Sequence, residues 1–218
     1  MRRSACACLL LFVLSGLASA QILDRTDNQF WSDVQVTVPM TRNVDFNVLG
    51  TFRLGRDISH AVDERIGMGF TFRLGQHVSI APNYLYVATQ PVPNRRGWES
   101  RLSLPVTLRF NIEKFRLSDR NLLERRFRNP GTTSTRYRNR LQVEHPVGRA
   151  ELGFSLYVAD EVFYDWSIDR WVRNRFTVGG SKVFNKHFTQ DVYYLRQNDG
   201  VSVPGDLNVI GTTLRVKL

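Results

Sequence analysis

Residues that commonly build reactive or metal-binding sites are scarce in this chain of 218 residues. It contains two cysteines and four histidines, and both cysteines, Cys6 and Cys8, lie close to the N-terminus. Cleavage of that segment, which its composition predicts, would leave no thiol for a disulfide or for a zinc site. The absence suits a protein that crosses an oxidising compartment, where stray thiols would pair wrongly.

Long apolar runs are also absent beyond residue 20. No later segment approaches the about 18 consecutive apolar residues of a membrane-spanning helix, so a helical membrane protein is excluded. The N-terminus differs, because Arg2 and Arg3 precede the apolar run Leu9–Leu14 and residues 18–20 read Ala-Ser-Ala. This pattern is typical of a secretory signal peptide. We therefore predict a signal peptide over residues 1–20, followed by a single domain over residues 21–218.

What the rest of the chain has in abundance is alternation of apolar and polar side chains. In Thr135–Glu144 the even positions are mostly arginine, and the odd positions include Tyr137, Leu141 and Val143. Successive side chains of a strand point to opposite faces, so one face of this segment is apolar and the other is charged. The same pattern predicts eleven strands, at residues 30–38, 43–54, 62–74, 77–89, 98–112, 115–127, 135–145, 150–162, 170–184, 187–197 and 207–217.

The length of these strands favours a membrane barrel. Strands of soluble proteins average about five or six residues, whereas a tilted membrane strand needs about 9–11. The connections alternate between short and long, as expected for barrels with short periplasmic turns and longer external loops. Because bacterial barrels have even strand numbers, we expect ten or twelve strands, with twelve preferred. Either Ile22–Asp27 is an additional strand, or one of the eleven segments is wrongly divided.

The charged face of each strand should point inward. Arginine facing lipid at mid-bilayer costs about 2–4 kcal/mol, and ten to twelve strands enclose a lumen too wide for an apolar filling. The predicted fold is thus an all-β, antiparallel, transmembrane up-and-down β-barrel with a charged lumen. Opposite charges should pair there, because unpaired buried charge is costly. The predicted lumenal charge network comprises Arg65, Arg101, Arg109, Glu99, Arg120, Glu124, Arg126, Arg136, Arg138, Arg140, Glu144, Glu151, Glu161, Arg173 and Arg175.

The inward glycines and the aromatic residues at strand ends add two further predictions. Gly67 and Gly69 also point inward, and their missing side chains should make room for guanidinium groups of neighbouring strands. Aromatic residues gather near strand ends, which is typical of the girdles at membrane interfaces. The predicted girdle comprises Phe30, Trp31, Phe72, Trp98, Phe115, Phe127, Tyr137, Phe163, Tyr164, Trp166, Trp171, Phe184 and Phe188.

Several segments together resemble a known bacterial family. They are Ser118–Glu124, Arg136–Arg140, Glu161–Asp165 and Arg173–Arg175, the last followed by Gly179. In these motifs the chain resembles the family called domain of unknown function 2490, over essentially all of residues 21–218. The resemblance implies an outer-membrane barrel and no established activity.

Sites for catalysis or metal binding are poorly supported. His77 and Ser79 share the inward face, but a nucleophile needs its base within hydrogen-bonding distance and a third group to orient the base, and none is evident. Asp160, Glu161, Asp165 and Asp169 surround one connection, yet their spacing matches no calcium loop. Gly179-Gly180-Ser181 lacks the lysine of a phosphate-binding loop, so a bulge or a close approach of strands is the better interpretation. We expect no catalytic residue, no metal and no cofactor.

Two main functions remain open on the sequence. The first is a structural or surface-interaction protein whose lumen is filled by an arginine–glutamate network; the second is a narrow, porin-like channel for anionic solutes. A lipid hydrolase acting at the rim is a weaker alternative.

The partners we expect follow from the predicted location. They are outer-membrane lipids, lipopolysaccharide, whose phosphates Arg125 and Arg128 could contact near the rim, and the barrel assembly machinery. Leu218 replaces the phenylalanine or tryptophan with which many outer-membrane proteins end. The net charge of +10 would also suit nucleic acid, but export and the spread of arginines along strands argue against it.

Overall fold

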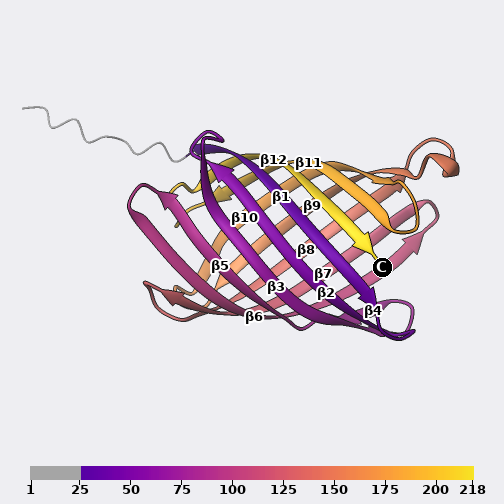
Figure 1. The fold of residues 1–218 in the computed structure, drawn as a ribbon, viewed down its shortest axis with the longest axis horizontal. Coiled ribbons are helices and arrows are strands. Elements are labelled where there is room, and N and C mark those ends of the chain that lie inside the picture. Colours follow the sequence, from indigo (N-terminus) through magenta and orange to yellow (C-terminus); the bar gives the residue numbers. More distant parts are fainter. Residues whose placement is uncertain (1–25) are drawn as a thin grey trace, which may run out of the picture.

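The computed structural model describes residues 26–218, without the side chain of Ala150, and forms a closed β-barrel (Figure 1). Its one short helix within those residues is η1 (Ala150–Leu152), and none of them forms a helix able to cross a membrane. The predicted signal peptide, with Cys6 and Cys8, and residues 22–25 of the proposed additional strand lie outside the described residues. The strands are β1 (Thr26–Pro39), β2 (Val44–Gly55), β3 (His60–Leu74), β4 (Val78–Ile80), β5 (Asn83–Val92), β6 (Arg95–Ile112), β7 (Phe115–Asn129), β8 (Ser134–Pro146), β9 (Phe154–Asp165), β10 (Arg170–Val183), β11 (Phe188–Asp199) and β12 (Asp206–Lys217).

These segments make eleven spanning strands, because β4 and β5 are two parts of one. Both pair with β3 on one side and with β6 on the other, and the interruption falls at Ala81 and Pro82. Proline has no N–H to donate to a neighbouring strand, which explains a break at this point. The structure thus confirms the barrel and contains the eleven segments that alternation identified, one spanning strand fewer than the preferred twelve.

An odd number of spanning strands changes how the barrel closes. β1 pairs with β12 in parallel, from Thr26 beside Asp206 to Thr37 beside Lys217. All other neighbouring strands are antiparallel. In an up-and-down barrel the first and last of an odd number of strands run in the same direction, so this one parallel seam is unavoidable. An even strand count is therefore not required for closure.

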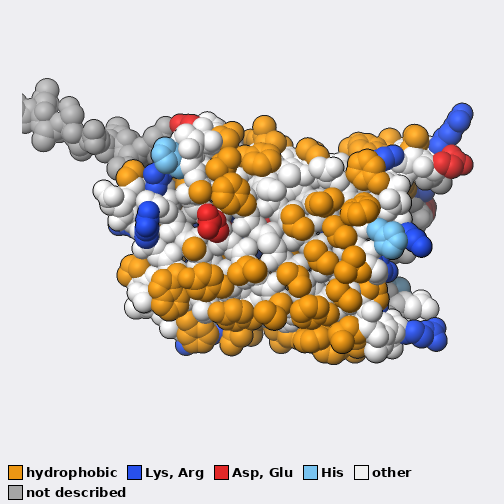
Figure 2. Space-filling model, in the orientation of Figure 1, with side chains coloured by type: hydrophobic (Ala, Val, Ile, Leu, Met, Phe, Trp, Pro, Cys, Tyr) orange, Lys and Arg blue, Asp and Glu red, His pale blue; other side chains and the backbone are white. Residues whose placement is uncertain are grey.

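Alternation along the strands separates an apolar outside from a polar inside. On the outer surface Ile66, Leu102 and Ile210 are 64%, 54% and 58% exposed. Inside, Glu124 and Arg136 are 2% and 4% exposed. Figure 2 shows hydrophobic side chains over the middle of one face of the barrel, with most lysines and arginines of that face toward its two ends. The side chains of each strand thus divide as their period of two requires.

The interior also has an apolar sector beside the parallel seam, which the sequence analysis did not predict. Trp31, Leu195, Leu207 and Val209 form a buried cluster there, with Tyr193 packed against it. Trp31 was expected in the interfacial girdle, but its side chain is 3% exposed because Trp31 lies at an inward position of β1. The lumen is therefore lined partly by hydrophobic contacts and only partly by charge.

The two ends of the barrel are named here by the chain itself. At the N-terminal end β1 begins, and at the C-terminal end β12 finishes (Figure 1). The expected alternation of short and long connections is not found. The β5–β6 hairpin has only residues 93–94 between its strands, and the longest connection, residues 147–153, lies at the C-terminal end. Several strands continue beyond the alternating segments from which they were predicted. Residues expected in the longer loops therefore belong to strands, as at the ends of β5 and β6.

One predicted network residue is misplaced for the opposite reason, a strand that begins later than predicted. Glu151 lies in η1 and is exposed, because β9 begins at Phe154 instead of at residue 150. The glycines also behave differently from expectation. A side chain at Gly67 or Gly69 would overlap β5, at Leu85 and Asn83 respectively. These glycines therefore permit a close approach of β3 and β5, and they do not make room for guanidinium groups.

Candidate functional site

The most deeply buried carboxylate of the interior is Glu124 on β7, which four arginines surround. Arg136 donates to it from Nε and Nη2, at 3.1 and 2.6 Å. Arg101, Arg138 and Arg126 lie 3.8, 3.7 and 3.9 Å from the same carboxylate. They come from β6, β7 and β8, whose inward positions are brought to one level by the antiparallel register. Glu124 is therefore held by charge from both neighbouring strands as well as its own.

Glu161 on β9 is a second centre of the same kind. Its Oε1 accepts hydrogen bonds from Arg120 and Arg138, each at 2.8 Å from Nη2. Its Oε2 lies 3.8 Å from Arg175 on β10. Since Arg138 contacts both Glu124 and Glu161, the two carboxylates belong to one connected set of charges. We call this set the central network: Arg101, Arg120, Glu124, Arg136, Arg138, Glu161 and Arg175.

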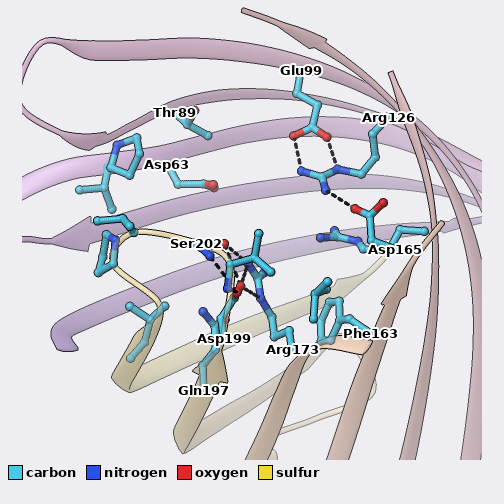
Figure 3. A pocket seen from close by; sticks show the side chains of 18 of the residues that line it. Asp63, Thr89, Glu99, Arg126, Phe163, Asp165, Arg173, Gln197, Asp199 and Ser202 are labelled. Atoms are coloured by element: carbon cyan, nitrogen blue, oxygen red, sulfur yellow. Dashed lines mark hydrogen bonds and ion pairs between the residues drawn. The ribbon is translucent and has the colours of Figure 1, made fainter. Parts of the chain in front are cut away.

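Further ion pairs lie between the central network and the N-terminal end. Glu99 accepts hydrogen bonds from Arg101 at 2.8 Å and from Arg126, and Arg126 also lies 3.8 Å from Asp165 (Figure 3). Across the lumen, Arg173 donates from Nε to Asp199 at 2.7 Å. These carboxylates sit at or near strand ends, so they neutralise arginines close to the mouth of the barrel.

Aromatic rings support several of the same arginines that contact carboxylates. The Phe163 ring is fully buried, and the guanidinium carbons of Arg138 and Arg175 lie 4.6 and 4.9 Å from its centroid. Arg53 lies 3.6 Å from the centroid of Trp31. A cation over an aromatic face is attracted to it, by about 0.5–2 kcal/mol depending on desolvation. Phe163, predicted for the girdle, instead occupies an inward position of β9 and packs within the charges.

The remaining predicted network residues are spread along the lumen. Arg65 bonds Asp63 on its own strand at 2.8 Å, and Arg109 donates to Ser79 at 2.8 Å near the C-terminal end. Glu144 accepts from Arg116, at 2.5 Å, also toward the C-terminal end. Arg140 is the lateral neighbour of Arg120 and of Glu161 in the sheet. Only Glu151 among the predicted residues is outside the lumen.

Cavities are present at both ends of the barrel, and those at opposite ends are lined by different residues. At the N-terminal end a cavity of about 480 Å³ is lined by charged residues such as Arg53, Glu99 and Arg173 and by Phe163 (Figure 3). At the C-terminal end two cavities of about 280 Å³ each lie near Asp45 and Arg73. The cavities at opposite ends have no lining residue in common.

Two tyrosines occupy the level between those cavities. The Tyr157 ring lies against Gly179 and the Tyr193 ring lies against Gly211, each on a neighbouring strand. The Tyr193 hydroxyl is 3.4 Å from Asp33, on the far side of the seam. The close approach predicted around Gly179 is thus confirmed: because glycine has no side chain, the ring of the neighbouring tyrosine can lie over it on the inner wall of the barrel.

The residues considered for catalysis and metal binding do not assemble. His77 bonds the carbonyl oxygen of Arg109 and stacks on Phe110, whereas Ser79 accepts from the Arg109 guanidinium. Asp160 and Asp169 bond Asn174 and Tyr164, while Glu161 and Asp165 face inward. In the part of the chain that the structure describes, no three acidic, cysteine or histidine side chains are grouped to hold a metal ion.

Sequence reasoning missed several residues of the site, chiefly aspartates. Asp63 and Asp199 hold arginines of the lumen, yet neither was named for the network. Both lie at inward positions of strands, so strict extension of the alternation to strand ends would have included them. Gln197, which accepts from Arg175 at 2.8 Å, could have been found in the same way. The same alternation would have placed the two buried aromatic rings inward, since Trp31 is two residues from Gln29 and Phe163 is two residues from Glu161 and Asp165.

Comparison with known proteins gives a matching family model and similar solved structures. No curated protein matches the chain. The anion-selective porin from Comamonas acidovorans is similar in structure, with a TM-score of 0.41 and 14% identity over 81% of this chain and 54% of that one. This chain spans about half the length of that porin. A family model described as "Protein of unknown function (DUF2490)" matches residues 28–207. Since the match covers most of its length, the chain belongs to the DUF2490 family.

Proposed function

We propose that this protein is an outer-membrane β-barrel with a closed interior, serving as a structural or surface-interaction protein. The apolar outer surface and the length of the strands support insertion into a bilayer. Most strands have 12 to 18 residues, whereas about 9–11 are needed to cross. The outward hydrophobic residues would contact lipid, and Arg125, exposed on the outer face of β7, could bind lipopolysaccharide phosphates near the rim.

The separation of the cavities at the two ends is the observation that carries the proposal. The cavities at the two ends share no lining residue. Tyr157 and Tyr193 line neither end, and arginines of the central network form part of the wall of the N-terminal-end cavity. Glu124 and Phe163 are almost completely buried in the wall of side chains that results. A continuous water path needs open space at every level, so a barrel packed in this way would not pass ions at a steady rate.

A narrow anion-preferring channel is the second candidate, and one observation favours it. Arginines outnumber carboxylates among the residues that line the N-terminal-end cavity. A surplus of one charge sets ion selectivity in pores. For the channel to operate, however, the tyrosines and the central network would have to move aside. No arrangement of residues described above favours the lipid hydrolase.

Conductance in a planar lipid bilayer distinguishes the two candidates. We expect the refolded barrel to show no steady conductance steps. The double substitution Tyr157→Ser with Tyr193→Ser should raise conductance, because it removes both rings from the level between the cavities. The matched control is Tyr86→Ser with Tyr194→Ser, which removes two rings from the outer surface, where they are 40% and 47% exposed. Steady anion-selective steps from the unmodified protein would contradict the proposal.

A further inference from the structure

The N-terminal-end cavity has a marked surplus of positive charge. Ten arginines and four carboxylates line it, together with apolar residues from the surrounding strands and connections. Behind the lining lie Glu124, Glu161 and Arg120, which shares Glu161, so the surplus becomes five charges. A surplus of this size in an enclosed space attracts anions, because low-dielectric walls concentrate the electric field.

The four carboxylates of the cavity are already occupied by donors. Glu99 holds Arg101 and Arg126, and Asp199 accepts from Arg173 and from the backbone N–H groups of Val201 and Ser202 at 2.8 and 2.9 Å. The other two are engaged in the same way: Asp63 holds Arg65, and Asp165 accepts from the Ser167 hydroxyl and N–H. The groups of the cavity that remain available to a ligand are therefore hydrogen-bond donors.

Unused donors belong to four arginines of the lining. Among the described residues Arg95 has no ion pair or side-chain hydrogen bond, and Arg128 donates only to the Thr132 carbonyl oxygen, at 2.9 Å. Deeper in the cavity, the Nε atoms of Arg53 and Arg101 are buried without a hydrogen-bond acceptor. Buried donors are nearly always paired in proteins, so unpaired ones call for an explanation.

From these observations we propose that the N-terminal-end cavity binds a small organic anion carrying two phosphate groups. Guanidinium groups bind phosphate oxygens in pairs, and each phosphate monoester carries about 1.5 to 2 negative charges. Two such groups carry about three to four negative charges and so offset most of the surplus. The cavity volume of about 480 Å³ is within the usual range for small-molecule sites. Val201, Val203 and Pro204 give the carbon part of the ligand an apolar wall.

This inference deepens the proposed function by naming a class of ligand. It rests on that proposal, because the cavity can retain a ligand only if the barrel interior beneath it is closed. In an open channel the same arginines would act as a selectivity region. Binding is therefore measured on the whole refolded barrel in detergent, by titration calorimetry with sodium pyrophosphate as the probe and citrate as the comparison.

The arginines of the β5–β6 hairpin and of β7 offer matched variants. Arg95→Gln with Arg128→Gln removes two charges from the lining, whereas Arg96→Gln with Arg125→Gln removes two from the outer side at the same end of the barrel. We expect pyrophosphate to bind one site per barrel, more tightly than citrate, with affinity that falls as salt is raised. The first double variant should bind at least about tenfold more weakly, because charged hydrogen bonds are lost. The second should bind as the unmodified barrel does.

Several results would overturn the inference. They are absence of pyrophosphate binding to the unmodified barrel, equal weakening by both double variants, or tighter binding of citrate. A conductance recording under the same conditions separates this inference from the proposed function. A silent barrel that does not bind pyrophosphate refutes only the binding site. A conducting barrel that pyrophosphate blocks refutes the closed interior and supports the site.

Discussion

At the scale of single residues, carboxylates determine how so many arginines can be buried together. Glu124 contacts four arginines, and Glu161 contacts three. Each of these contacts offsets part of the cost of removing a guanidinium from water. A carboxylate at the centre of such a cluster thus affects the stability of several neighbours at once, which a surface ion pair does not.

The substitution Glu124→Gln tests this difference. Removing one partner of a buried pair leaves uncompensated charge, which typically costs about 3–5 kcal/mol. We expect a loss of that order in the free energy of unfolding, measured by urea titration of the barrel in detergent micelles. Glu144→Gln is the control, since its partner Arg116 has a side chain that is 54% exposed and solvent screens the pair. A loss under about 1 kcal/mol is expected there. Equal losses would refute the role assigned to Glu124.

At the scale of elements, the parallel seam is the feature that most distinguishes this barrel. β1 and β12 share twelve register pairs, and the buried cluster of Trp31, Leu195, Leu207 and Val209 packs against their inner side. Parallel pairing is slightly less stable per residue than antiparallel pairing. The apolar cluster therefore stabilises the barrel where its hydrogen bonding is weakest.

Introduced cysteines can test the register of this seam. Val34 and Leu214 are paired neighbours at outward positions, so Val34→Cys with Leu214→Cys should form a disulfide on mild oxidation. The product is detected as a mobility change that a reductant reverses. Val34→Cys with Ile210→Cys is the control. Ile210 lies four residues before Leu214 on β12, which places it about 13 Å from Leu214 along the strand. Cross-linking of the control pair but not of the first would show that the seam is wrong.

At the scale of the whole molecule, closure leaves no free strand edge. Every spanning strand is paired on both sides, including β1 with β12. A closed ring of hydrogen bonds has no edge at which detergent or another chain can begin to open the sheet. Resistance to denaturing detergent at room temperature follows from this topology.

We therefore expect heat-modifiable migration on a denaturing gel. The unboiled protein should remain compact and migrate faster than the boiled protein. A variant truncated after residue 205 lacks β12 and cannot close, so its boiled and unboiled samples should migrate alike. Identical migration of the boiled and unboiled full-length protein would contradict a closed barrel of this kind.

The sequence by itself determined the strands and which side chains face inward. Alternation has a period of two in any strand, so it can be recognised within a single segment such as Thr135–Glu144. Predictions that depended on one strand at a time, such as the inward arginines of β8, agree with the structure. The family could also be recognised from short motifs, because these motifs lie within single strands.

Only the tertiary structure decided how the strands combine. Three features depend on the register between strands: the parallel seam, the packing of Trp31 and Phe163 against arginines of other strands, and the pairing of Arg138 with both Glu124 and Glu161. Whether the interior is open depends on side chains that meet from several strands, as Tyr157 and Tyr193 do over their glycines. These contacts join residues far apart in the chain, and the physical reason they escape prediction is that local alternation carries no information about which strands become neighbours or at what level.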